Sequence, residues 1–219
     1  MLRAILLVIL FAVGMTDVAI ADKPGLKGIR GTDDRKLERT QKFPWSAIGR
    51  VNVRTRGVGF CSGTLIAPNK VLTAAHCFWN KQTRRWAHPK SIVYLAAYSL
   101  SDYLDHSKVK SYRLSDPNLP NLAAIKKDLT KDWAILELEK PLGDTIGYLP
   151  LMPIKGKEIA QAGYSKDKPH VLTVNEKCYV TGRDKRMLNH DCDATFGDSG
   201  SPILVRDGKK IGVGALNVA

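Results

Sequence analysis

The sequence has few aromatic residues, fewer acidic than basic residues, and hardly any long apolar run. Aromatic residues make up 7% of the 219 residues. None lies inside the basic clusters at residues 81–85, 126–131 and 183–186. Proteins that bind single-stranded nucleic acid stack bases on aromatic side chains beside basic ones, so specific nucleic-acid binding has no support here. There is also no internal repeat or low-complexity tract, which excludes solenoid and collagen-like architectures.

The one long apolar run lies near the N-terminus, at residues 4–15, after Arg3. It is shorter than the roughly 20 residues that span a bilayer, which argues against the alternative of a membrane anchor. Ala19, Ile20 and Ala21 have the small-x-small pattern of a signal-peptide cleavage site. We therefore expect a signal peptide at residues 1–21, an N-terminal arm at 22–42, and a secreted protein (periplasmic or extracellular) with no membrane span in the mature chain.

Cysteine is scarce, with four residues, all beyond the predicted cleavage site. The sequence contains neither a Cys-x-x-Cys pair nor a His-x₃-His pair, so we expect no zinc site and no other metal. Export to an oxidising compartment favours disulfides instead. Four cysteines allow three connectivities, and the residues alone leave these open.

Basic residues outnumber acidic ones, 34 to 21, which gives a formal net charge of +13. Such a charge is most simply a solvated basic surface. The alternative is electrostatic steering towards acidic partners.

Short apolar or β-branched segments bounded by Gly, Pro, Asn and Asp predict an all-β fold. Only residues 74–78 and 122–127 indicate helical turns. The predicted strands are residues 51–58, 71–72, 92–97, 134–138, 157–163, 171–180, 203–206 and 210–213.

Three short motifs follow one another along the chain. Cys61 to Ile66 leads into Leu72-Thr73-Ala74-Ala75-His76-Cys77, Asp132-Trp133-Ala134-Ile135-Leu136 follows, and the last is Phe196-Gly197-Asp198-Ser199-Gly200-Ser201-Pro202. Alone, each has an ordinary structural explanation, since Gly, Asp and Ser favour turns and a His beside a Cys is usually packed in a core. Together they supply the imidazole, carboxylate and hydroxyl that activate a serine nucleophile.

These motifs and their His–Asp–Ser order resemble the trypsin/chymotrypsin superfamily of serine proteases, with features of its bacterial secreted, glutamyl-endopeptidase-like branch. The resemblance implies two packed six-stranded antiparallel β-barrels: residues 43–145 with His76 and Asp132, and residues 146–219 with Ser199. Superfamily members continue past the strand that here reads Ile211 to Leu216. We therefore expect either that the sequence is a C-terminal fragment or that the second barrel, without its usual last strand, closes in an unusual way.

The resemblance also implies a secreted endopeptidase that works through an acyl-enzyme, without a cofactor, on polypeptide substrates, and we expect a monomer. His76 would be the general base, Asp132 its orienting carboxylate (Asp128 is the alternative), and the amides of Gly197 and Ser199 the oxyanion hole. Disulfides Cys61–Cys77 and Cys178–Cys192 follow from the same resemblance. The alternative class is a non-catalytic binding protein on a protease scaffold.

Substrate preference depends on the residues before and after Ser199. By alignment with the family, Asp193 would form the pocket floor and Gly214, Ala215 and Leu216 its wall, which predicts cleavage after basic residues. Ala194 offers no hydroxyl, so Arg should be preferred over Lys. A Glu-specific enzyme is the alternative, although the His that this branch places near the last strand is missing.

Asp198 needs a stabilising partner if it is buried. In the digestive members, cleavage of a zymogen releases an N-terminal ammonium for this role. Gly28-Ile29-Arg30-Gly31 resembles such a mature start, but Gly28 is not the basic residue expected before the cleavage site. Cleavage before Ile29 therefore stays open.

Overall fold

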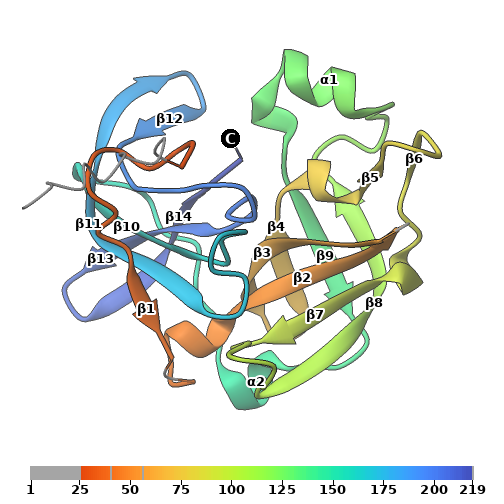
Figure 1. The fold of residues 1–219 in the computed structure, drawn as a ribbon, viewed down its shortest axis with the longest axis horizontal. Coiled ribbons are helices and arrows are strands. Elements are labelled where there is room, and N and C mark those ends of the chain that lie inside the picture. The colour runs from red at the N-terminus through yellow and green to blue at the C-terminus, as the bar shows by residue number, and fades with distance from the viewer. Residues whose placement is uncertain (1–25, 40, 56, 219) are drawn as a thin grey trace, which may run out of the picture.

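The computed structural model describes residues 26–39, 41–55 and 57–218 (Figure 1). The predicted signal peptide lies outside the described residues. Within the described part of the chain, no helix is long and apolar enough to cross a membrane.

The first half of the chain forms a closed barrel of six antiparallel strands, in the order β2-β3-β4-β9-β8-β7. Alternate residues of β7 and β9 are buried, as a strand with one face on a core requires. The bounds are β2 (Ile48–Thr55), β3 (Gly57–Ala67), β4 (Lys70–Thr73), β7 (Ile92–Ala96), β8 (Asp105–Leu114) and β9 (Ala134–Leu138).

Short elements connect these strands. The predicted helical turns are confirmed as η2 and α1. The bounds are η1 (Trp45–Ala47), η2 (Ala75–Phe78), β5 (Trp79–Asn80), β6 (Arg85–Trp86), η3 (Pro89–Ser91), α1 (Leu122–Lys127), η4 (Leu129–Lys131) and α2 (Gly143–Ile146).

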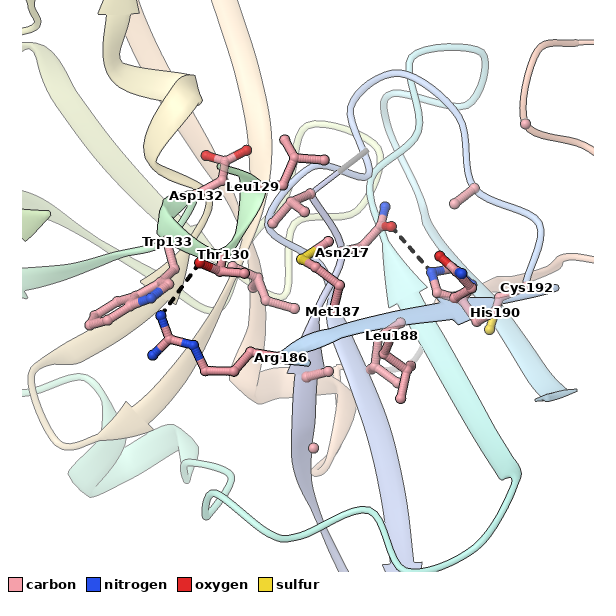
Figure 2. A pocket seen from close by; sticks show the side chains of 18 of the residues that line it. Leu129, Thr130, Asp132, Trp133, Arg186, Met187, Leu188, His190, Cys192 and Asn217 are labelled. Atoms are coloured by element: carbon pink, nitrogen blue, oxygen red, sulfur yellow. Dashed lines mark hydrogen bonds between the residues drawn. The ribbon is translucent and has the colours of Figure 1, made fainter. Parts of the chain in front are cut away.

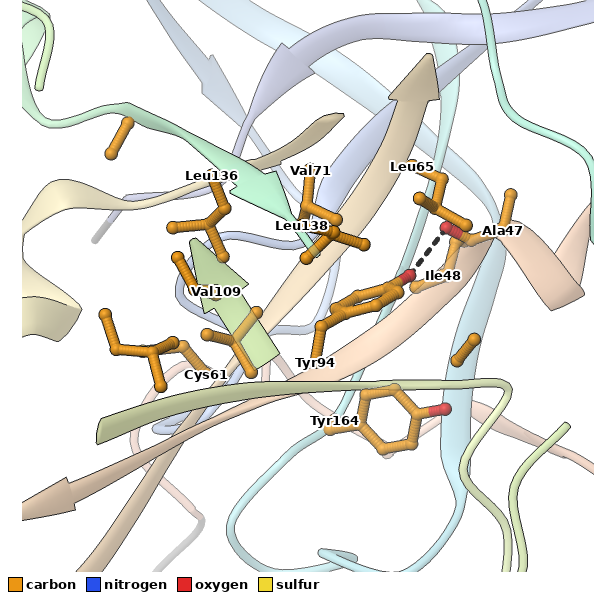
Figure 3. Close-up of a cluster of buried hydrophobic side chains, with 14 of the residues drawn as sticks. Ala47, Ile48, Cys61, Leu65, Val71, Tyr94, Val109, Leu136, Leu138 and Tyr164 are labelled. Atoms are coloured by element: carbon orange, nitrogen blue, oxygen red, sulfur yellow. Dashed lines mark hydrogen bonds between the residues drawn. The ribbon is translucent and has the colours of Figure 1, made fainter. Parts of the chain in front are cut away.

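The barrel interior is filled by aliphatic side chains and by Tyr94, which is fully buried (Figure 3). The Tyr94 hydroxyl donates to the carbonyl oxygen of Ala47 at 3.0 Å, so the polar end of this ring is satisfied inside the core. Tyr164, from the second half of the chain, packs into the same cluster. Its hydroxyl donates to the carbonyl oxygen of Tyr98, which ties the two halves together.

The second half forms a six-stranded antiparallel sheet in the order β1-β11-β10-β13-β14, with β12 paired to β11. Among the described residues its end strands β1 and β14 do not pair with each other, whereas the first barrel closes fully. The bounds are β1 (Lys36–Glu38), β10 (Glu158–Gly163), β11 (Leu172–Asp184), β12 (Met187–His190), β13 (Pro202–Asp207) and β14 (Lys210–Leu216).

Strand β1 comes from the segment expected to be an arm. It pairs with β11 in the register Lys36↔Val174 and Glu38↔Leu172 (Figure 1). The N-terminal arm is therefore built into the sheet of the second half.

Candidate active site

His76 and Asp132 meet at the end of the first barrel. His76 lies in η2, directly after β4, and Asp132 lies between η4 and β9. The Nδ1 atom of His76 is 2.7 Å from Oδ2 of Asp132, and the His76 backbone amide donates to Oδ1 at 2.8 Å. Asp132 is buried, while the His76 side chain is 27% exposed. The carboxylate therefore fixes the ring from one side and leaves its other nitrogen free to face a substrate.

Asp128, the alternative partner, is occupied elsewhere. Its carboxylate accepts from the backbone amide and the hydroxyl of Thr130 and caps η4. The bond to Thr130 holds the pKa of Asp128 below its ordinary value.

The segment of residues 195–201, here called the oxyanion loop, carries Ser199 onto the first barrel. The Ser199 carbonyl oxygen accepts from the Ser62 amide at 2.9 Å. At Gly200, with φ +84°, a Cβ would lie 2.4 Å from Oγ1 of Thr73 and 2.9 Å from the Ala74 amide. Only glycine allows this approach, which brings Ser199 beside the strand that leads to His76. Among the described residues the Ser199 hydroxyl makes no hydrogen bond.

Gly197 is the second position of this loop where a side chain is excluded. Its φ is +99°, and a Cβ would lie 2.6 Å from the carbonyl oxygen of Tyr164. Within the described residues, the amides of Gly197 and Ser199 have no hydrogen-bond acceptor. Two unpaired amides in one tight turn are available to an oxyanion.

Asp198 points inward from the same loop and is fully buried. Its carboxylate accepts from the Ser165 hydroxyl at 2.6 Å, the Thr195 amide at 2.9 Å and the Gln161 side-chain amide at 3.2 Å. Burial raises the pKa of Asp198, and these hydrogen bonds work against that rise.

Both predicted disulfides are present, Cys61–Cys77 and Cys178–Cys192. The first ends next to His76, and the second ends next to Asp193, just before the oxyanion loop. The sulfurs of Cys61 and Cys77 lie close to the His76 ring. Because those sulfurs are bonded to each other, they are not available as thiolate ligands for a metal.

A cavity of about 530 Å³ opens beside Asp132 (Figure 2). Gly214, Ala215 and Leu216 of β14 line it, as the family resemblance implies. Arg30, Arg186 and His190 also line it. Arg186 reaches across to Thr130, and its guanidinium lies 3.4 Å from the Thr130 hydroxyl. The lining of the cavity thus includes two arginines and a histidine.

Asp193 does not line this cavity, although the sequence led us to expect it at the pocket floor. It is 3% exposed, and its carboxylate accepts from the Arg30 backbone amide at 2.8 Å. The neighbouring Ala194 amide donates to the Gly28 carbonyl oxygen at 3.1 Å. The N-terminal segment therefore contacts Asp193, and Arg30 rather than Asp193 lines this cavity. The role expected for Asp193 in substrate binding stays a prediction.

His190, the last residue of β12, places an imidazole in the lining of this cavity. Its Nε2 lies 3.3 Å from Oδ1 of Asn217, whose amide nitrogen donates to the Asp198 carbonyl oxygen. The amide oxygen must therefore accept, which assigns the proton to Nε2. The His190 Nδ1 is buried without a partner among the described residues. Burial lowers the pKa of His190, and the positive charge of Arg30 lowers it further.

A family model described as Trypsin matches residues 35–217. The chain belongs to the trypsin family. Its all-β architecture, with one closed six-stranded barrel and a second sheet, agrees with this membership.

Individual members show similarity of different kinds. Glutamyl endopeptidase of Bacillus licheniformis is 25% identical over 184 residues, which cover 82% of this chain and 55% of that protein. Serine protease 23 of Homo sapiens is 30% identical over 171 residues, which cover 68% of this chain and 44% of that protein. The chain thus spans about half the length of these curated relatives.

A solved structure of a Glu endopeptidase in complex with MPD superposes with a TM-score of 0.69 at 25% identity. The superposition covers 85% of this chain and 86% of that one. The trypsin-family fold is thus shared over nearly the whole length of both chains.

Proposed function

We propose that this trypsin-family chain is a serine endopeptidase that uses His76, Asp132 and Ser199. The observation that carries the proposal is the His76–Asp132 hydrogen bond of 2.7 Å beside a loop whose Gly197 and Ser199 amides are unpaired. His76 would take the Ser199 proton as the hydroxyl attacks the substrate carbonyl, and would return it to the leaving amine. The Ser199 hydroxyl makes no hydrogen bond among the described residues, which is compatible with this role because catalytic hydrogen bonds often tighten only when substrate binds.

The electrostatics of the cavity support cleavage after acidic residues rather than basic ones. Arg30 and Arg186 border it, and Asp193 is withdrawn to the Arg30 amide. A substrate carboxylate would find guanidinium donors and the unpartnered Nδ1 of His190, which binding would favour in its protonated form. The similarity to glutamyl endopeptidases supports the same preference.

The nucleophile is tested with a fluorophosphonate probe, which reacts rapidly only with an activated serine. We expect stoichiometric labelling of the wild type and none of Ser199→Ala. An unlabelled but folded wild type would favour a non-catalytic binding protein on this scaffold.

The preference is tested by kcat/KM on peptides that differ only in Glu, Leu, Lys or Arg before the cleaved bond. We expect Glu to lead. Arg30→Gln should lower the Glu-to-Leu ratio about tenfold, or about 1.4 kcal/mol. Arg183→Gln is the matched control, since Arg183 is an exposed arginine outside the cavity lining, and it should leave the ratio unchanged. If Arg or Lys leads, the preference predicted from Asp193 is right after all.

We further propose that the mature chain works outside the cytoplasm as a monomer on polypeptides. Two disulfides among the described residues support the oxidising compartment.

A further inference from the structure

The buried Asp198 has no ion-pair partner among the described residues, yet a buried arginine lies one side chain away. Arg35 directly precedes β1, and its side chain has no exposed surface. Its guanidinium is held by two carboxylates, with Nε 2.8 Å from Oδ1 of Asp33 and Nη2 2.7 Å from Oδ2 of Asp167. Two acids for one guanidinium explain how this charge is tolerated in the interior.

The remaining guanidinium nitrogen reaches the hydroxyl that supports Asp198. Nη1 of Arg35 donates to Oγ of Ser165 at 2.9 Å, and that hydroxyl is 2.6 Å from Oδ2 of Asp198. Ser165 is fully buried. The Ser165 side chain thus links the N-terminal arm to the oxyanion loop. A second contact joins them at the surface, where Lys27 Nζ lies 5.9 Å from the centre of the Phe196 ring.

The donors and acceptors around Ser165 determine which way its hydroxyl donates. Arg35 can only donate, so the Ser165 oxygen is an acceptor on that side and its one proton must go elsewhere. The neighbouring Thr173 hydroxyl, 3.1 Å away, can give its own proton to the Gly163 carbonyl oxygen at 3.0 Å. The shortest contact left for the Ser165 proton is the one to Asp198.

Asp198 in turn organises the oxyanion loop. Its carboxylate holds the Thr195 amide, its backbone amide donates to the Thr195 carbonyl oxygen at 3.1 Å, and its own carbonyl oxygen accepts from the Ser201 amide at 2.8 Å. These bonds set the turn that aims the amides of Gly197 and Ser199. The Ile29 amide, by contrast, is bonded to the Leu26 carbonyl oxygen and takes no part.

We infer that Arg35 is a positioning residue for the oxyanion loop, acting through the Ser165 hydroxyl on Asp198. The chain thereby places a cation behind Asp198 without an N-terminal ammonium. The inference rests on the proposed function for its effect on catalysis, but the link itself has a structural readout that does not depend on activity.

The test compares Ser165→Ala and Arg35→Met with the matched control Thr173→Val, which removes an adjacent buried hydroxyl that does not touch Asp198. Hydrogen exchange of peptides covering residues 195–201 is measured first. We expect at least about tenfold faster exchange in Ser165→Ala and Arg35→Met, and wild-type exchange in Thr173→Val. Equal exchange in Ser165→Ala and wild type would overturn the inference, whether or not the protein hydrolyses peptides.

The second measurement uses kinetics. Ser165→Ala should lower kcat by about 10- to 100-fold, below the loss of about 10²–10³ seen when an oxyanion donor is deleted outright. KM should change little, because the cavity is intact. Affinity for a peptide aldehyde, whose adduct needs the oxyanion hole, should fall by the same factor as kcat.

If Ser165 had a purely structural role, Ser165→Ala would change KM and kcat together. Alternatively, Thr173→Val and Ser165→Ala would lose the same thermal stability and would have equal activities. Either result would contradict positioning. Arg35→Lys is a further check, because one ammonium cannot bond both carboxylates and Ser165 as the guanidinium does. This variant should fold, but hydrogen exchange in the oxyanion loop should stay as fast as in Arg35→Met. A wild type that neither labels nor hydrolyses would refute the proposed function alone.

Discussion

His76 and Ser199 come from different halves of the chain, and the proposed mechanism needs both. We expect Ser199→Ala and His76→Ala each to reduce kcat by about 10⁴–10⁶-fold with the fold retained, because each removes the same proton-transfer step. The double variant should be hardly slower than either single one. The measurement is steady-state hydrolysis of a peptide ester, with circular dichroism as the control for folding. Additive losses would contradict the assignment of these two residues to one unit.

Single residues differ in how far sequence could place them. The motifs around His76 and Asp132 predicted that these two side chains meet, and they do, because each lies in a local pattern whose backbone shape follows from its neighbours. Arg35 lies in a segment with no such pattern, and the pattern around Arg30 predicts a cleavage site rather than a contact. Their positions depend on contacts with residues far along the chain, such as Asp193 and Asp167. No local signal could reveal those partners.

At the scale of elements, the N-terminal arm should make the protein sensitive to acid. Bonds from Arg35 hold the pKa of Asp33 below its ordinary value, and they do the same for Asp167 against the effect of burial. A lowered folded pKa contributes stability that is present above the unfolded value of about 3.9 and is lost as pH falls through the folded value. We expect the thermal midpoint to drop steeply below about pH 4.

Asp167→Asn serves as the comparison for this acid loss. It should be less stable than wild type at pH 6, and its midpoint should fall less between pH 4 and pH 2. Asp198 acts in the opposite sense: with a raised folded pKa, it binds its proton more tightly when folded, so acid favours the fold through this group. If the thermal midpoints of Asp167→Asn and wild type fell in parallel with pH, Asp167 would not contribute to the loss of stability in acid.

The Cys178–Cys192 disulfide joins the β11–β12 hairpin to the start of the loop that carries Asp193. Its sequence separation is 14, against 16 for Cys61–Cys77, so chain entropy predicts about 3 kcal/mol of stability from each. Replacing either pair with alanines should therefore cost a similar free energy of unfolding, measured in urea. Only loss of Cys178–Cys192 should alter the Glu-to-Leu ratio, because it alone anchors the strand that bears His190. A changed Glu-to-Leu ratio in the variant that lacks Cys61–Cys77 would show that the preference does not depend on Cys178–Cys192 alone.

The elements that sequence missed share a physical cause. Strand β8 carries charged or polar side chains at most of its positions, so its pattern is weak although it pairs with β7 and β9. The predicted strand at residues 51–58 crosses the end of β2 and the start of β3, because the valines at 51, 53 and 58 lie on both sides of that hairpin. Strand β1 has only three residues and forms because β11 offers an edge. Pairing partners, rather than local preference, decide all three.

For the whole molecule, the net charge of +13 should accelerate the capture of acidic substrates. We expect kcat/KM for a peptide with several acidic residues to fall about tenfold when NaCl rises from about 10 mM to about 500 mM, because salt screens the attraction. A neutral peptide that shares the cleaved bond is the control and should change less than about twofold. Equal salt dependence for the two peptides would show that the charge is only a solvated surface.

Strand β1 is synthesised long before β11, the strand with which it pairs. Arg35 and Asp167 are 132 positions apart, so at translation rates of about 5–20 residues per second the arm waits roughly 7 to 26 s for its partner. During that time Arg35 has Asp33 as a carboxylate partner but still lacks Asp167. The last step of folding is then the return of one of the earliest segments made. A growing chain is therefore unable to complete the support of its own oxyanion loop until the second sheet has left the ribosome.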